Sequence, residues 1–273
     1  MEPLTRESAD RSSGLLESDE APPVAVENEG APGQFVIICD HAGRAVPRRI
    51  DLGVPASELD RHIAWDIGVD PLGLMLGERL VATVVRQHYS RLVIDCNRDP
   101  ARDDAMPEVS DGASIPANLS LSAEAKAARV AAIHAPYHDR IATLLDARAA
   151  AGRPTAVLFL HSFTPVMAGH VRPWRFGVLH TGEPLALAML QLLRDADVGE
   201  IGDNEPYAMD EVDYTAARHG RARNLDFVEL EIRQDLISTE EGRVVIADLL
   251  ARLLPEALGS TQPKKPGFPR SRE

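Results

Sequence analysis

Apolar strand-like runs alternate with amphipathic helix-like segments through most of this sequence, and this alternation limits the fold more than any other feature. Buried strands are predicted at residues 35–39, 82–87, 90–96, 155–162, 175–181 and 226–236. Helices are predicted at residues 57–68, 70–80, 122–150, 183–196 and 239–254. Strands that alternate with helices are typical of an α/β sandwich with a largely parallel sheet.

Composition limits the class of partner. The chain has 273 residues, a net charge of −13 and a pI near 5.2, which argues against nucleic acid or an anionic membrane as the main partner. We therefore expect a small-molecule ligand. Cys39 and Cys96 lie inside apolar runs and are expected to be buried free thiols of a reducing compartment. The acidic start lacks a leader pattern, and no apolar stretch is long enough to cross a membrane, so we expect a cytoplasmic protein.

The ends of the chain differ from its middle. Residues 1–33 are rich in Glu, Ser, Pro and Gly and show no periodic apolar pattern, which predicts a disordered acidic tail. Residues 259–273 are polar, basic and rich in Pro, which predicts a second tail. One folded domain is therefore expected over residues 34–258.

Polar side chains follow the predicted strands where they end. His41, Asn97-Arg98, His161 and His180 each follow an apolar run, and Glu229 and Glu231 lie inside the last one. In α/β folds, sites form at the carboxyl ends of parallel strands. A single histidine in such a place is more often structural than functional. Several polar groups at one sheet edge favour a site, because each buried polar group needs a partner.

Two of these histidines suggest a metal centre. Two imidazoles and one carboxylate form a common catalytic zinc (Zn²⁺) set that leaves a position open for water. His41 and His161 are the natural imidazoles, and Asp66, an acid inside an apolar stretch, is the best carboxylate. Asp66 could instead cap a helix or pair with Arg61 or His62. Asp40 ranks lower because a continued strand would turn it away from His41.

Glu231 is the candidate general base. A carboxylate beside activated water can take its proton and pass it to a leaving amine. Glu229 shares the same strand face by the period of two and competes for this role. Alternatively, Glu231 pairs with Arg233 on that face.

Arginines supply candidate anion contacts. An arginine fork binds a carboxylate with two hydrogen bonds, and a neighbouring Asn amide adds a donor, so Asn97 and Arg98 are expected to bind a substrate carboxylate. Arg91 could do the same or stabilise an oxyanion. Arg172 and Arg175, on either side of Trp174, are a second candidate anion contact, although a surface turn explains them nearly as well.

Taken together, these motifs resemble the N-formylglutamate amidohydrolase family. The matching segments, in the family's order across about residues 35–250, are "DHAGRAVP", "RHIAWDIGVDPL", "YSRLVIDCNRDP", "LFLHSFTP", "RPWRFGVLHTG" and "RNLDFVELEIRQDLI". The resemblance implies a three-layer α/β/α domain with a mostly parallel mixed sheet, similar to zinc carboxypeptidases and aspartoacylase-like deacylases.

The resemblance also implies roles for single residues. By it, His41 and His161 match the zinc histidines and Arg91 matches the arginine that polarises the carbonyl. Asn97-Arg98 match the carboxylate-binding pair, and Glu231 matches the general base. The chain departs from the pattern at position 44, where Arg44 stands in place of an acid, so Asp66 is assigned as the third ligand from this sequence alone.

The leading hypothesis is a zinc-dependent amidohydrolase that removes the N-acyl group from an acidic amino acid such as N-formyl-L-glutamate. The alternatives are a carboxypeptidase-like or deacylase activity on another N-acyl amino acid or small peptide, and a non-catalytic ligand-binding protein. The sequence leaves the oligomeric state open.

Overall fold

A seven-stranded mixed sheet forms the centre of the computed structural model, which describes residues 14–209 and 213–261. The strand order is β1-β3-β2-β6-β11-β9-β10. The strands span Val24–Glu27 (β1), Phe35–Cys39 (β2), Thr83–Gln87 (β3), Ala156–Phe163 (β6), Phe176–Leu179 (β9), Ile201–Asp203 (β10) and Asp226–Arg233 (β11). The four strands β3, β2, β6 and β11 are parallel, β1 is antiparallel to β3, and β9 is antiparallel to β11 but parallel to β10. Two small hairpins stand apart from the sheet, β4–β5 (Val109–Ser110, Ala113–Ser114) and β7–β8 (Val166–Met167, His170–Val171).

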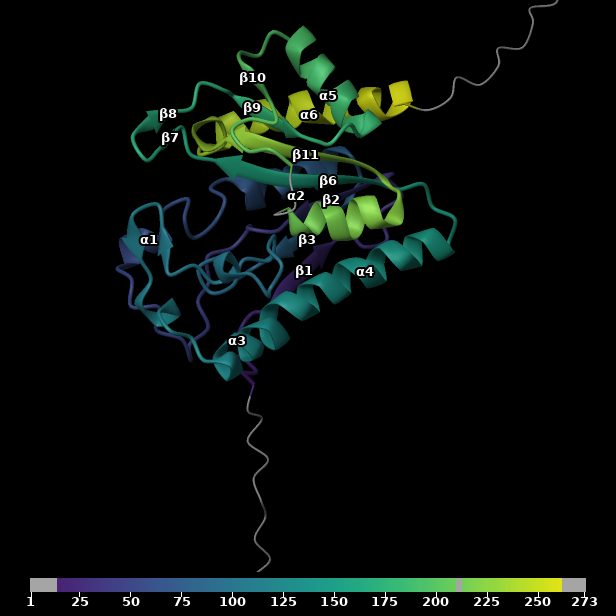
Figure 1. Cartoon of the computed structure of the whole chain (residues 1–273). Coiled ribbons are helices and arrows are strands. Elements are labelled where there is room, and N and C mark those ends of the chain that lie inside the picture. The colour runs from purple at the N-terminus through teal and green to yellow at the C-terminus, as the bar shows by residue number, and fades with distance from the viewer. Residues whose placement is uncertain (1–13, 210–212, 262–273) are drawn as a thin grey trace, which may run out of the picture.

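Helices cover both faces of this sheet and complete three layers (Figure 1). On one face lie α2 (Val69–Arg79), α5 (Pro184–Asp195) and α6 (Glu240–Thr261). The other face carries α3 (Ala123–Arg129), the π-helical turn η3 (Val130–His134), α4 (Ala135–Ala150) and the π-helical turn η4 (Ala216–Gly220). Short helical pieces lie in the loops at Ala56–Leu59 (α1), Asp103–Ala105 (η1), Pro116–Asn118 (η2), Arg221–Arg223 (η5) and Gln234–Leu236 (η6). This architecture confirms the predicted α/β/α sandwich.

The two cores explain the continuous apolar runs of the central strands. In β2, Ile37 and Cys39 pack with α2 and its neighbours, while Val36 and Ile38 pack with the α4 side, and all four are fully buried. A strand covered on both faces needs apolar residues at every position, unlike a strand with one wet face. None of the described helices has the length and apolarity needed to span a bilayer.

The predicted tail at residues 1–33 is partly wrong. Val24–Glu27 forms the edge strand β1, antiparallel to β3, and its residues are half-buried. Tyr89 Oη donates to the Ala21 carbonyl at 2.7 Å, which ties the segment down further. The short "VAVE" run carries too little apolar surface to signal a strand, yet the open edge of β3 supplies its backbone partners. Residues 1–13 and 262–273 lie outside the described part of the chain, and α6 continues to Thr261, beyond the predicted boundary at 258.

Two local predictions also differ from the structure. Residues 90–96, predicted as a strand, form a turn-rich segment in which Leu92, Val93 and Ile94 are buried without strand pairing. Residues 57–68, predicted as a helix, contain only the last three residues of α1, followed by turns. In both segments apolar side chains reach the core from turns and loops. An apolar run in the sequence was therefore not enough to indicate a strand or a helix.

Candidate active site

A cavity of about 420 Å³ lies at the carboxyl ends of β2, β6 and β11. Most of the predicted site residues line it: His41, Asp66, Arg91, Asn97, Arg98, His161, Glu229 and Glu231. They come from strand ends and from two loops that follow them. The parallel strands therefore bring together polar groups that are far apart in sequence.

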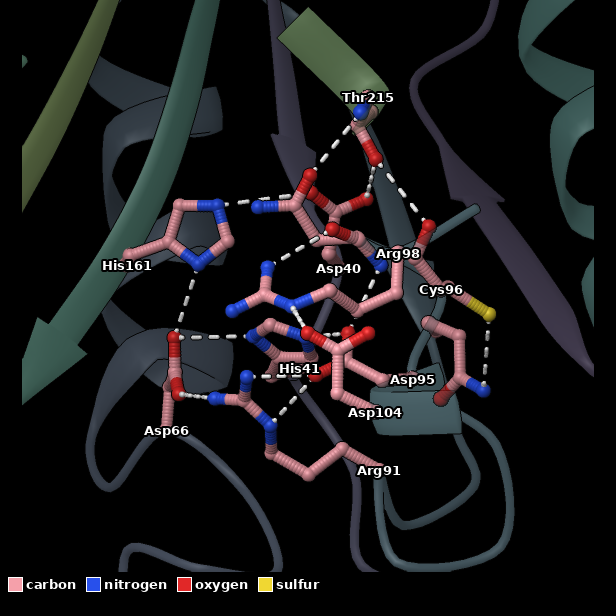
Figure 2. A network of polar contacts seen from close by, with 12 residues as sticks. Asp40, His41, Asp66, Arg91, Asp95, Cys96, Arg98, Asp104, His161 and Thr215 are labelled. Atoms are coloured by element: carbon pink, nitrogen blue, oxygen red, sulfur yellow. Dashed lines mark hydrogen bonds and ion pairs between the residues drawn. The ribbon is translucent and has the colours of Figure 1, made fainter. Parts of the chain in front are cut away.

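Three buried side chains form a candidate metal centre. His41, Asp66 and His161 each offer a ligand atom, and these atoms all lie within 4.8 Å of one another. Asp66 Oδ2 is 3.4 Å from His41 Nδ1 and 3.0 Å from His161 Nδ1 (Figure 2). The Asp66 backbone N–H donates to the His41 carbonyl, which fixes the loop against the end of β2. The neighbours proposed as alternative partners lie elsewhere, because Arg61 and His62 pair with Asp111.

The far nitrogens of both imidazoles face other carboxylates. His41 Nε2 donates to Asp95 Oδ1 at 2.7 Å, and His161 Nε2 lies 3.4 Å from Asp40 Oδ2. Such a partner fixes the tautomer and orientation of a ligating histidine. Both Nδ1 atoms consequently point at Asp66, and His41 Nδ1 is buried without a hydrogen-bond partner among the described residues.

The electrostatics of this group favour positive charge. Burial acts to lower the pKa of His161, but the nearby Asp40 and Asp66 carboxylates outweigh it and hold that pKa well above its ordinary value. Burial and Arg91 also oppose protonation of His41, yet the Asp95 and Asp66 carboxylates raise its pKa. Buried carboxylates around two imidazoles thus create a field that attracts a cation.

Glu229 and Glu231 lie on the same face of β11 and both line the cavity. Glu231 is in register with His161 on β6, and its Oε2 has no hydrogen-bond partner within the described ranges. Burial and the Asp66 charge raise the pKa of Glu231 to about 7, although His161 and Arg91 lower it. Burial also raises the pKa of Glu229, with Asp213 adding to the effect. Arg233 is not the partner of Glu231, because it pairs with Asp235.

Arg91 braces the candidate metal centre. Its Nε and Nη2 donate to Asp95 Oδ2 at 2.9 and 2.5 Å, and its Nη1 lies 3.6 Å from Asp66 Oδ1 (Figure 2). Burial opposes its charge, but Asp95 and Asp66 raise its pKa. Arg91 therefore contacts two carboxylates and also lines the cavity.

Asn97 and Arg98 lie next to it in the loop that follows Asp95. The Asn97 backbone N–H donates to Asp95 Oδ1 at 2.8 Å, and its side-chain Oδ1 accepts from the Thr215 N–H at 2.9 Å. Arg98 Nη1 donates to the Asn97 carbonyl, and its Nε lies 3.5 Å from Asp104 Oδ2. Both side chains reach the cavity wall.

The two remaining arginines do not line the cavity. Arg172 Nη1 donates to Tyr207 Oη at 2.9 Å and its Nη2 to Met167 Sδ at 3.1 Å, so it contacts two residues of the cavity wall. Arg175 lies away from it, with its aliphatic chain against Gly199. Its backbone bonds to Glu200, which precedes β10, and to Arg233, the last residue of β11, and its side chain is outside the cavity lining, so an anion contact by Arg175 stays a prediction.

His180 also lies outside the site. Strand β9 runs antiparallel to β11, so its carboxyl end points to the opposite edge of the sheet, where His180 Nε2 pairs with Asp203 at 3.0 Å. Arg44, found where an acid is typical of the family, is half-exposed, pairs with Asp60 and stacks on Trp65.

Sequence reasoning missed the carboxylates that support the histidines. The sequence indicated no site role for Asp95, and a continued strand would have turned Asp40 away from His41. The strand ends at Cys39, and Asp40 then accepts hydrogen bonds from Tyr137 Oη at 2.8 Å and Thr215 Oγ1 at 3.0 Å. The available signal was an acid embedded in an apolar run, since a buried carboxylate requires partners.

Comparisons with known proteins show the family of this chain. The family described as N-formylglutamate amidohydrolase matches residues 33–238. A gene product of Agrobacterium tumefaciens of known crystal structure is 38% identical, with a TM-score of 0.87, over 90% of this chain and 98% of that one. The structure of N-formylglutamate amidohydrolase from Ralstonia eutropha is 19% identical, with a TM-score of 0.62, over 88% of this chain and 98% of that one. No curated protein matches the sequence. Because the family match covers most of the chain, this protein belongs to the N-formylglutamate amidohydrolase family.

Proposed function

We propose that this amidohydrolase is zinc-dependent and releases the N-acyl group, formyl above all, from an N-acyl acidic amino acid such as N-formyl-L-glutamate. The observation that carries the proposal is the donor set around Asp66. Two imidazole Nδ1 atoms and one carboxylate oxygen converge in a buried position beside the cavity.

The residues present fit a zinc ion. The set of two histidines and one carboxylate is a common catalytic one, and His41 Nδ1 has no competing partner among the described groups. Asp95 and Asp40 face the opposite nitrogens, as expected for ligating histidines. His41, Asp66 and His161 would therefore hold the ion. When bound, zinc would supply a Lewis acid that makes water acidic and polarises a carbonyl.

Glu231 would act as the base. Its carboxylate lies across from His161 on the neighbouring strand, with one oxygen free to accept a proton from water. The water oxygen then bonds to the acyl carbon. Glu231 passes its proton to the amide nitrogen as the C–N bond breaks, which yields a carboxylic acid and a free amine.

The arginines would orient the substrate. Arg91 reaches both Asp66 and the cavity, where its guanidinium can stabilise negative charge that develops on the carbonyl oxygen. Asn97 and Arg98 would bind a substrate carboxylate. In a protein of net charge −13, such a local basic group is needed to attract an acidic substrate.

A hydrolysis screen with metal analysis tests the proposal. The purified protein, loaded with zinc and freed of excess metal, is offered N-formyl, N-acetyl and N-succinyl derivatives of glutamate, aspartate and leucine. We expect about one zinc per chain and fastest release of formate from N-formyl-L-glutamate. Absence of bound zinc and of turnover would refute the proposal. A preference for N-acetyl or N-succinyl substrates would instead indicate another deacylase.

A further inference from the structure

We propose that a buried chain of hydrogen bonds, Arg223–His219–His138, positions the loop of Asn97 and Arg98 for substrate binding. The inference rests on the proposed function of that loop, but the chain itself lies outside the cavity. His138 is thus a positioning residue rather than a catalytic one.

The contacts run in one line from the surface to the loop. Arg223 Nη1 lies 3.3 Å from His219 Nδ1, and His219 Nε2 lies 2.9 Å from His138 Nδ1. His138 Nε2 lies 2.9 Å from the Cys96 carbonyl oxygen. Both histidines are almost fully buried, and their rings stack at 5.2 Å with an interplanar angle of 10°.

The two ends of the line fix the proton positions. A guanidinium only donates, so His219 Nδ1 must accept and its proton must lie on Nε2. A carbonyl only accepts, so His138 must carry its proton on Nε2 and accept at Nδ1. These two requirements agree at the His219–His138 contact, and they need both rings to be neutral. Burial lowers the pKa of His138 to about 3 and that of His219 to about 4, which is consistent with neutral rings.

A second imidazole bonds to the same loop. His134 Nε2 lies 3.0 Å from the Arg98 carbonyl, and the His134 and His138 ring centroids are 4.4 Å apart. The carbonyls on either side of Asn97 are therefore both held by buried N–H groups. His134 and His219 each belong to a π-helical turn, a feature that often occurs at functional sites.

His138 and His134 hold the loop from outside the cavity, while Asp95 holds it next to the candidate metal centre. Asp95 Oδ1 accepts from both His41 Nε2 and the Asn97 N–H. Loss of the bond to Cys96 should therefore loosen Asn97 and Arg98 without removing a ligand from the metal centre. The expected signature is weaker substrate binding with zinc retained.

The direct test uses the unmodified, zinc-loaded protein. Long-range ¹H–¹⁵N NMR of the imidazole nitrogens at neutral pH should show His138 and His219 as neutral rings protonated on Nε2. A His138 ring that is protonated on Nδ1, or that is cationic, would overturn the proposal. This NMR measurement does not depend on catalysis. It therefore distinguishes failure of the proposed function from failure of the proposed hydrogen-bond chain.

Matched variants test the consequence. His138→Leu removes the donor, and we expect KM to rise about tenfold while kcat changes less than about threefold and zinc content stays unchanged. His138→Gln can still donate to Cys96, so its KM should remain within about threefold of the wild type. The control is His88→Leu, which removes another imidazole bonded to a backbone carbonyl, that of Pro22, away from the cavity.

The variants also allow the inference to fail. An unchanged KM in His138→Leu, or equal losses in the Leu and Gln variants, would overturn it. If His138→Leu does not fold, His219→Phe serves instead, because it keeps a stacked ring but removes the donor to His138. We expect its KM to rise about threefold, and an unchanged KM would contradict a role of this hydrogen-bond chain in substrate binding.

Discussion

Asp66 lies between two imidazoles, that of His41 in the turn after β2 and that of His161 on β6. Its carboxylate also lies within 3.6 Å of Arg91 and accepts the Ser162 N–H at 3.2 Å. Burial opposes its charge, but the two histidines hold the pKa of Asp66 far below the ordinary range. It is therefore ionised at neutral pH, as a metal ligand must be.

Replacing Asp66 should remove the metal. In Asp66→Ala we expect zinc affinity to fall by more than the roughly 10- to 100-fold that loss of a partner of a metal-bound histidine costs. Zinc titration with a competing chelator measures this. Asp60→Ala, in the same loop and exposed, is the control and should bind zinc normally. Unchanged zinc affinity in Asp66→Ala would refute the ligand assignment.

Glu231 and Glu229 can be separated by amide substitutions. In Glu231→Gln we expect kcat to fall about 10³-fold while zinc stays bound, because the amide cannot take a proton from water. In Glu229→Gln we expect a loss below about tenfold, since this residue is in register with Phe159 rather than His161. Steady-state kinetics with metal analysis decides, and the reverse order would assign the base to Glu229.

At the scale of elements, a close backbone contact fixes the loop after β2 that carries His41. Gly43 lies so near the His88 backbone that a Cβ would overlap the His88 carbonyl. Two residues later, Ala45 donates its N–H to that carbonyl and forms an isolated bridge with Tyr89. Gly43 therefore lets the loop after β2 approach the segment after β3.

Filling that space should destabilise the protein. In Gly43→Ala we expect the free energy of unfolding to fall by about 1–3 kcal/mol, the usual cost of an overpacked contact. Urea unfolding of the zinc-loaded protein measures it. Gly30→Ala is the matched control, because a Cβ there meets nothing within 4 Å. Equal stability of the two variants would contradict the steric argument.

Element predictions succeeded where local pattern and core position coincide. The strands β2, β3, β6 and β11 and the helices α2, α4, α5 and α6 all overlap predicted segments, although α6 continues past its predicted end at residue 254 to Thr261. Continuous apolar runs indicated the central strands, and amphipathic patterns indicated the helices. Residues 90–96 failed because their apolar side chains reach the core from turns. Strand β1 was missed because its short sequence carries little apolar surface. Its backbone pairing with β3 stabilises it instead.

For the whole molecule, the buried histidines predict a loss of stability in acid. The pKa values of about 3 for His138 and about 4 for His219 lie below the ordinary value of about 6.5. Below pH 6.5 the unfolded chain binds these protons and the folded one does not, so stability falls as the pH decreases. Each histidine removes up to about 1.4 kcal/mol of unfolding free energy per pH unit, until its folded pKa is reached.

Urea unfolding between pH 7.5 and 5 measures this slope. The double variant His138→Gln, His219→Gln cannot take up these protons, so its stability should depend less on pH over the same range. Parallel curves for the two proteins would contradict the prediction. Other groups that titrate differently in the folded state, such as His41 and His161, contribute equally to both curves and cancel in the comparison.

The sequence by itself determined the layers of this protein and identified the histidines, the acids of the candidate metal centre and base, and the three arginine and asparagine side chains that line its cavity. Apolar runs depend on neighbours along the chain, so they predicted the strands. Polar groups at the ends of these runs marked His41 and His161, and acids inside apolar stretches marked Asp66 and Glu231. Tertiary structure alone decided which of these side chains meet. The antiparallel direction of β9 carries His180 away, and the turn after β2 brings Asp40 to His161. Strand direction and the partner of a buried charge depend on long-range contacts, which no local pattern contains.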